Sequence, residues 1–255
     1  LDTNTYTFAA TYDFSAPGTY TIKVWVDHVG DNHRANDTMV RVIKQLANDP
    51  ITLSPSFTEG FETPAAATYT APTLGFIGLD RADFNADSST GRARTFVNTG
   101  LARTGNRAVT LDQIKYSDSL TTDTLITTFN LSSYNSSHQL WLDFYYRNHG
   151  EDFPAPNSQV WIRGSDLGAW VPVFTFATND PSHFGVYRAA PPINITQELA
   201  NAVPPQTVSS SFQVKFGQQG YTSANSVINN ANFDDGFTFD DIKITNAAND
   251  VGIMA

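Results

Sequence analysis

The sequence predicts an all-β protein, and three observations support this prediction. Thr and Asn are abundant and Lys is scarce, short runs alternate apolar with polar residues, and Gly, Pro, Asn or Asp separate these runs. The chain has 255 residues, of which 40% are hydrophobic and 13% aromatic, so it can fill the core of one large domain, with or without a smaller piece. A composition this rich in apolar residues argues against disorder.

The net charge of the chain and its lack of cysteine exclude several classes of function. The formal net charge of −10 argues against a nucleic-acid partner, because phosphates call for clusters of Lys and Arg, whereas it suits a secreted protein that binds hard cations through oxygen ligands. Without cysteine, the chain forms no disulfides, thiolate nucleophiles or cysteine zinc sites. No apolar run approaches the ~20 residues of a membrane span, so we expect no membrane insertion. The chain starts at Leu1 without a signal-like segment, which indicates a processed product or a piece of a longer protein.

Residues 1–46 contain three alternating runs, and we expect a strand in each of 5–14, 18–28 and 38–44. Three strands are fewer than the roughly seven of an immunoglobulin-like sandwich. We therefore interpret residues 1–46 as part of an immunoglobulin-like β segment, or as a sheet that leans on the next domain.

The rest of the chain is divided into a linker at 47–55, one domain at 56–246 and a tail at 247–255. The tail is expected to end the chain or to begin a following module, because its first residues resemble those of the linker. Within the domain one helix is expected at 195–203. The clearest strands are expected at 123–131, 139–148, 158–165, 169–177, 210–220 and 236–245.

Six short motifs of the large domain point to a family through their order. They are GFE at 60–62, TGNRAVTLD at 104–112, LWLDFYYRNHG at 140–150, VWIRG at 160–164, FQVKFGQQGY at 212–221 and FDDIKI at 239–244. This order resembles the MAM family of jelly-roll domains, and more closely its cysteine-free bacterial relatives, including the cleaved-adhesin domains of secreted Bacteroidetes proteins. The resemblance covers roughly residues 56–246 and implies a two-sheet antiparallel jelly-roll sandwich. The first segment resembles the adhesion-type immunoglobulin-like repeats that often neighbour such domains.

The resemblance also implies a structural cation near the ends of the jelly roll. Glu62 and the pair Asp240–Asp241 match the positions of the family's ion ligands, and either Asp80 or Asp83 is expected to join them. The candidate ion is calcium, which takes six to eight oxygen ligands.

The residues of GFTFDDIKI (236–244) support an unusual strand independently of the resemblance. Phe237 and Phe239 share one parity while the two isoleucines that follow have the other, so a β-bulge is expected at Asp240–Asp241. One carboxylate would then point inward, which is costly unless a cation or hydrogen bonds meet it. The alternative is that both carboxylates lie on a solvated strand edge, where they discourage edge-to-edge pairing.

Other groups of residues favour binding over catalysis. The acidic stretch at 80–94 is interpreted as a solvated loop rather than a calcium loop, because the Glu that closes an EF-hand is missing. Neither H-E-x-x-H nor G-x-S-x-G occurs, and we expect no enzyme, with a jelly-roll glycanase as the remaining catalytic alternative. Most aromatic rings are expected in the core, and the candidates for a sugar-binding platform are Trp170, Tyr146 and Tyr187.

These observations together predict a non-catalytic, calcium-stabilised adhesion or ligand-binding module of a larger secreted or cell-surface bacterial protein. Its partners would be a glycan or an extracellular protein, together with neighbouring modules of the same parent chain. Two alternatives stay open: an accessory domain, such as a carbohydrate-binding one, of a secreted protease or glycanase, and a structural spacer in a repeat array.

Overall fold

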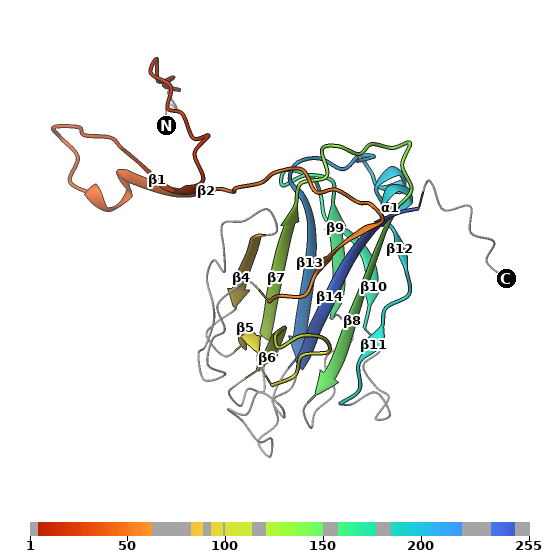
Figure 1. Ribbon diagram of the computed structural model, residues 1–255. Coiled ribbons are helices and arrows are strands. Elements are labelled where there is room, and N and C mark those ends of the chain that lie inside the picture. Colours follow the sequence, from red (N-terminus) through yellow and green to blue (C-terminus); the bar gives the residue numbers. More distant parts are fainter. Residues whose placement is uncertain are drawn as a thin grey trace. The chain divides into compact units, whose positions relative to one another are not determined.

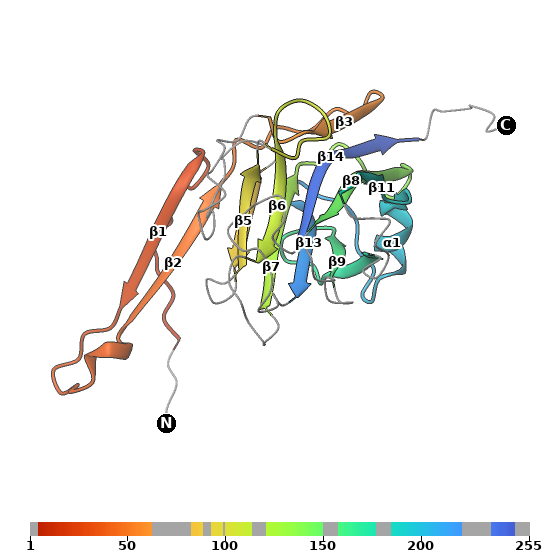
Figure 2. The same cartoon turned by 90° about the horizontal axis from the view of Figure 1, so that it is seen from below.

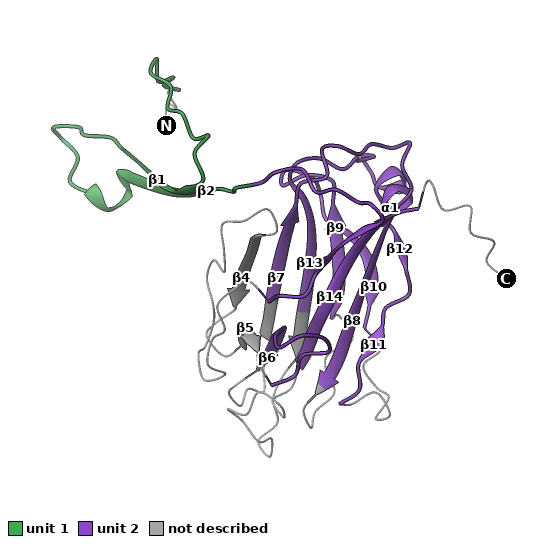
Figure 3. Ribbon diagram, in the orientation of Figure 1, with its two compact units in different colours: residues 1–47 green, residues 48–255 purple. Residues whose placement is uncertain are grey.

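The computed structural model describes residues 5–62, 83–88, 93–98, 100–113, 121–149, 158–176, 185–220 and 236–247 (Figure 1). The chain forms two compact units, residues 1–47 and residues 48–255 (Figure 3). Every strand pair among the described residues is antiparallel, and the only α-helix there is one short element. The predicted all-β fold is therefore confirmed. None of the helices in the described part of the chain is long and apolar enough to cross a membrane.

The first unit is a β-hairpin. Strand β1 (Gly18–Trp25) pairs along its whole length with β2 (Thr38–Gln45), and a 3₁₀ turn, η1 (Arg34–Asn36), lies between them. The third strand expected at 5–14 is not formed.

The aromatic residues of this stretch nevertheless contact the hairpin. The rings of Tyr12 and Phe14 lie 6.0 and 5.2 Å from the ring of Tyr20 on β1. These side chains gather around one ring of the hairpin, and the residues that carry them add no third row of backbone hydrogen bonds.

One sheet of the second unit has five strands in the order β10-β9-β13-β7-β4. Their bounds are β4 Asp83–Ser88, β7 Thr121–Phe129, β9 Gln159–Arg163, β10 Val171–Thr175 and β13 Phe212–Gly220. The acidic stretch expected to be a loop thus contains an edge strand, β4, which pairs with β7. Buried residues alternate with half-buried ones along β9, so one face of this sheet lies in the core and the other is partly exposed.

The other sheet has seven strands, with β11-β8-β14-β6-β5 as its main order (Figure 2). Short β12 also pairs with β8, and short β3 also pairs with β14. The bounds are β3 Ser56–Glu59, β5 Ala93–Asn98, β6 Ala108–Gln113, β8 Leu140–His149, β11 Arg188–Ala189, β12 Ile193–Asn194 and β14 Gly236–Asn246. Strand β14 is therefore central, with neighbours on both sides.

The core lies between the two sheets and is rich in phenylalanine. Phe144 of β8 and Phe239 of β14 lie 5.2 and 4.7 Å, between ring centroids, from Phe216 of β13 in the other sheet. Phe176 stacks on Phe237 at 4.5 Å. Each of these rings is buried, and burying a side chain of this size contributes about 1.5–3 kcal/mol to folding. Because these rings pack closely between the two sheets, the sheets form a rigid support for the side chains on their outer faces.

The segment predicted as a linker at 47–55 belongs to the sandwich. Ile51 and Leu53 are buried in its core, and the backbone N–H of Ile51 donates to the carbonyl of Asn130 at 2.9 Å. The alternation of Ile51 and Leu53 with polar residues was the signal of a buried extended segment. The predicted helix is present as α1 (Ile195–Asn201), and the side chain of Asn194 caps its first turn.

Candidate functional site

The predicted bulge at Asp240–Asp241 is present, and it lies where β14 changes neighbours. Residues 236–239 of β14 pair with β6, whereas residues 242–245 pair with β3. Opposite β8, Asp240 faces Tyr145 but Lys243 faces Asp143, so β14 carries one extra residue. The extra residue restores the parity, and the phenylalanines before the bulge and the isoleucines after it all contribute to the core.

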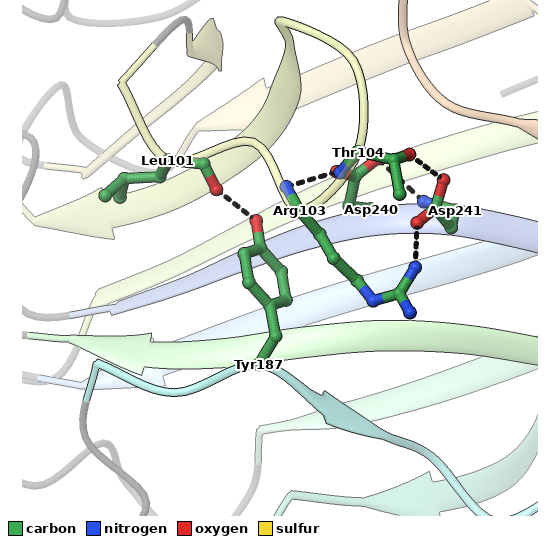
Figure 4. Close-up of polar contacts among 6 residues, drawn as sticks. All are labelled: Leu101, Arg103, Thr104, Tyr187, Asp240 and Asp241. Carbon is green, nitrogen blue, oxygen red and sulfur yellow. Dashed lines mark hydrogen bonds and ion pairs between the residues drawn. The ribbon is translucent and has the colours of Figure 1, made fainter.

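Asp240 is fully buried beneath the loop before β6, on the face of the sheet that it shares with its cross-strand partner Tyr145. Its Oδ2 accepts the backbone N–H groups of Arg103 at 2.7 Å and Thr104 at 3.2 Å, and its Oδ1 accepts that of Asp241 at 2.8 Å (Figure 4). Burial raises the pKa of Asp240 to about 6, and the backbone N–H groups act against this rise. The buried carboxylate thus holds the loop that enters β6.

Asp241 faces the same loop from the outer side of the bulge. Its Oδ2 forms an ion pair with Arg103 Nη1 at 2.6 Å, and its Oδ1 accepts the hydroxyl of Thr104 at 2.6 Å (Figure 4). The guanidinium of Arg103 also lies 3.4 Å from the ring centroid of Tyr145. Asp241 has a φ of 50°, a conformation that side chains other than Gly adopt at a cost, so these contacts fix a strained residue.

Glu62 accepts hydrogen bonds from the next turn of this loop. Its Oε1 accepts the backbone N–H groups of Asn106 and Arg107, both at 2.9 Å. Gly105 has a φ of +61°, and a Cβ there would collide with the Glu62 carboxylate. Three carboxylates predicted as ion ligands therefore converge on one loop, residues 100–107, and bind its N–H groups, a hydroxyl and a guanidinium.

The carboxylates whose side chains are described do not form a calcium site by themselves. Among those residues, no three Asp, Glu or His side chains come together as metal ligands. Asp80 lies outside the described residues; Asp83 begins β4 at the edge of the other sheet, and its side chain is not described. Calcium at Asp240–Asp241 stays a prediction, while the cation that the structure places against Asp241 is Arg103.

A cavity of about 400 Å³ opens beside this cluster, on the outer face of the seven-stranded sheet. Asp143 and Lys243 face each other in its wall. Burial raises the pKa of the Asp143 carboxyl, and the charge of Lys243 acts against this rise. The lining residues are Thr58, Arg103, Thr104, Asp143, Phe144, Tyr145, Ala189, Ala190, Asp241 and Lys243.

The outer face of the five-stranded sheet carries a second cluster, which we call the indole face: Trp161, Arg163, Trp170, Gln213 and Lys215. The ammonium of Lys215 lies 4.4 Å from the ring centroid of Trp161 and 4.5 Å from that of Trp170. The guanidinium of Arg163 lies 4.2 Å from the Trp170 centroid. Two indoles and two cations therefore form one surface across three neighbouring strands.

The strand register explains why these side chains meet. Trp161 and Arg163 alternate with buried residues along β9, so both point outward. Lys215 of β13 is directly opposite Trp161, and Gln213 is opposite Arg163. Arg163 Nε donates to Gln213 Oε1 at 2.7 Å, which fixes the guanidinium over the sheet.

Gly217 makes room for the Trp161 ring. A Cβ at this position would lie 2.6 Å from Trp161 Cζ3, so the indole rests directly on the backbone of β13. The ring is thus held by the sheet rather than by a loop.

The three aromatic residues predicted as ligand platforms have different environments. Trp170 belongs to the indole face and immediately precedes β10. Tyr146 is 6% exposed and packs on Phe176 at 5.1 Å between ring centroids, so its assignment to a platform is corrected to the core. The hydroxyl of Tyr187 donates to the carbonyl of Leu101, so this side chain also holds the 100–107 loop (Figure 4). Burial raises the pKa of the Tyr187 hydroxyl.

Sequence reasoning missed Trp161 and Lys215. The signal was present, because VWIR places its Trp and Arg at outward positions of a strand whose other residues are apolar. What the sequence did not show is that β13 lies beside β9 and brings a lysine and a glycine to the same indole.

No protein-family profile and no curated protein sequence matches this chain. Among solved structures it is similar to the C-terminal family 22 carbohydrate-binding module of Clostridium thermocellum Xyn10B, with 9% identity over 78% of this chain and 98% of that one and a TM-score of 0.40. It is also similar to the family 11 carbohydrate-binding module from Clostridium thermocellum bound to a β-1,3-1,4-mixed-linked tetrasaccharide (12% identity, 76% and 97% coverage, TM-score 0.40). A third is TmCBM61 in complex with β-1,4-galactotriose (14% identity, 78% and 99% coverage, TM-score 0.38). At this similarity, the ligands of those modules are not transferred to this chain.

Proposed function

We propose that this protein is a non-catalytic carbohydrate-binding module that takes a glycan on the indole face. The observation that supports this is the pair of indoles, Trp161 and Trp170, held on the outer face of a rigid sheet with polar side chains between them. Flat apolar rings beside hydrogen-bonding groups match a sugar, whose two faces carry C–H groups and whose edge carries hydroxyls.

The support beneath the indoles is pre-formed. Trp161 rests on Gly217, and the residues that alternate with the indole face on β9 and β13 are core residues between the two sheets. A binding surface fixed in this way loses little conformational freedom when a ligand arrives.

Binding without catalysis is the better match to this surface. A glycosidase requires two carboxylates flanking one bond. Burial lowers the pKa of Arg163 on the indole face, and the charge of the nearby carboxylate Asp166 acts against this. Asp166 accepts the hydroxyl of Ser211 at 2.9 Å, and the described side chains of the indole face itself include no carboxylate.

The broader assignment follows from the same surface. We place this module in a larger secreted or cell-surface protein, where a glycan-binding unit holds its neighbours against a polysaccharide. Membership of the MAM-like group and adhesion to an extracellular protein stay predictions, since the indole face favours a sugar over a protein ligand. A structural spacer would bind no glycan.

Loss of binding after removal of the indoles tests the proposal. Affinity electrophoresis and calorimetry on a panel of neutral and acidic polysaccharides would identify a ligand for the wild-type chain. Trp161→Ala and Trp170→Ala are each expected to weaken binding to that ligand by roughly tenfold or more, the size of a lost stacking contact. The matched control is Trp25→Ala, because this indole is 65% exposed in the hairpin unit and should leave affinity unchanged. Binding that survives both indole substitutions would exclude this face.

A further inference from the structure

The indole face is cationic in a protein of strongly negative charge. The whole chain carries a formal net charge of −10 from only 15 Lys and Arg against 25 Asp and Glu. Arg163 and Lys215 nevertheless share one indole, with Arg163 at 4.2 Å and Lys215 at 4.5 Å from the Trp170 centroid. Two scarce cations placed side by side indicate a role for positive charge on this surface.

Lys215 is positioned without a polar partner. Within the described part of the chain, its ammonium forms neither a hydrogen bond nor an ion pair, and its contacts there are the two indole rings. An ammonium has three donors, and that of Lys215 lies within 4.5 Å of the ring centroids of both Trp161 and Trp170. All three donors are therefore available to a ligand that lies against the indoles.

Arg163 also has hydrogen-bond donors without a partner among the described residues. Its Nε donates to Gln213 at 2.7 Å and its Nη1 to the carbonyl of Gly168 at 3.4 Å. Among the described residues, Nη2 has no hydrogen-bond partner. The protein thus orients the guanidinium through Nε and Nη1, and the Nη2 donors remain for an acceptor from outside.

The two cations also oppose each other. Burial lowers the pKa of the Lys215 ammonium, and the charge of Arg163 lowers it further. Burial likewise lowers the pKa of Arg163, while Asp166 acts against this. Since Asp166 accepts the hydroxyl of Ser211 and forms no ion pair with either cation in the described structure, its charge offsets the repulsion only in part.

We propose that the indole face recognises an acidic glycan, in which a sugar ring lies on Trp161 or Trp170 and its anionic group lies between Arg163 and Lys215. This rests on the proposed glycan-binding function and adds the chemical class of the ligand. An anion there would relieve the repulsion between the cations and occupy their free donors together. A neutral sugar would desolvate both cations without a countercharge, which costs affinity.

The test compares one acidic and one neutral polysaccharide of similar chain length on the same protein. Polygalacturonate carries a carboxylate on each sugar ring, and β-1,4-galactan is a neutral polymer of the parent sugar. We expect the acidic polymer to bind at least roughly tenfold more tightly, as an added charge-assisted hydrogen bond allows. Dextran sulfate serves as a further arm, and its binding relative to polygalacturonate distinguishes sulfate from carboxylate recognition.

Matched charge variants separate the site from general attraction. Lys215→Gln and Arg163→Gln should each lower the ratio of polygalacturonate affinity to galactan affinity by roughly tenfold, because each removes a charge that only the acidic polymer can pair with. Lys243→Gln changes the net charge equally on the opposite sheet and should have no effect. Trp161→Ala should weaken binding of both polymers by roughly tenfold, whereas attraction of an anion to the two cations alone would not depend on the ring. Near-UV circular dichroism of each variant checks that the sandwich is folded.

The outcomes are distinguishable. Equal, Trp161-dependent binding of the acidic and neutral polymers would overturn the acidic-glycan inference and keep the proposed function. Binding of polygalacturonate that Lys243→Gln weakens as much as Lys215→Gln, or that is indifferent to Trp161→Ala, would overturn the site. No binding of any polymer in the panel would overturn both.

Discussion

The two outer faces of the sandwich each place a cation on an aromatic ring, but only one of them neutralises it. On the seven-stranded sheet Arg103 lies 3.4 Å from the Tyr145 centroid and is paired with Asp241 at 2.6 Å. On the five-stranded sheet Lys215 lies between Trp161 and Trp170 and has no carboxylate partner among the described residues. A cation on an aromatic ring is therefore paired with a carboxylate on one sheet and lacks such a partner, among the described residues, on the other.

This difference distinguishes a cation with a structural role, Arg103, from a cation proposed to bind a ligand, Lys215. Arg103 completes a cluster that ties the 100–107 loop to the bulge of β14, because its backbone N–H donates to Asp240 and its Nη1 donates to Asp241. Lys215 is held between two indoles without such a partner among the described residues, and in the proposed site an anion from solution takes that role. A cation held in place without a countercharge indicates a surface built for an external anion.

The largest expected effect concerns the buried member of the paired cluster. Asp240→Ala removes the acceptor of three backbone N–H groups and should lower the free energy of unfolding by about 3 kcal/mol, because buried donors without acceptors are costly. Urea denaturation followed by tryptophan fluorescence measures this. Asp166→Ala, a substitution of a carboxylate at the exposed end of the five-stranded sheet, should change it by less than about 1 kcal/mol. Similar losses for both variants would show that Asp240 does not hold the loop.

A smaller effect is expected when the two cations, Arg103 and Lys215, are each replaced by methionine. Arg103→Met leaves Asp241 without its ion pair at a strained position and should lower the free energy of unfolding by about 1.5 kcal/mol. Lys215→Met keeps the apolar stem on the indoles and removes a repulsion, so we expect a change of less than about 0.5 kcal/mol. Urea denaturation at pH 7 gives both values. Equal destabilisation would remove the distinction between the two faces.

The smallest expected effect is that of calcium. If an ion joins the acidic cluster, removing it with a chelator should lower the melting temperature by the equivalent of roughly 1 kcal/mol, since a bound ligand stabilises the folded state by mass action. Thermal unfolding with and without excess calcium, in the wild type and in Asp241→Asn, measures this. A melt that does not respond in either protein leaves Arg103 as the counter-ion of Asp241 and ends the calcium prediction.

The sequence determined the elements and one of their irregularities. The strands expected between residues 121 and 246 are present, because their alternation of apolar and polar residues reflects one buried face. The parity change between Phe239 and Ile242 also predicted the bulge, since side chains that must all reach one core require an extra residue there.

Tertiary structure decided which groups meet. The carboxylates expected around an ion bind the backbone of the 100–107 loop, because β14 exchanges β6 for β3 at the bulge and leaves space for that loop. The stretch expected to be a linker was drawn into the core by Ile51 and Leu53. The indole face arose because β13 pairs with β9. Pairing between strands far apart in the chain depends on the whole sheet order, and local periodicity carries no information about it.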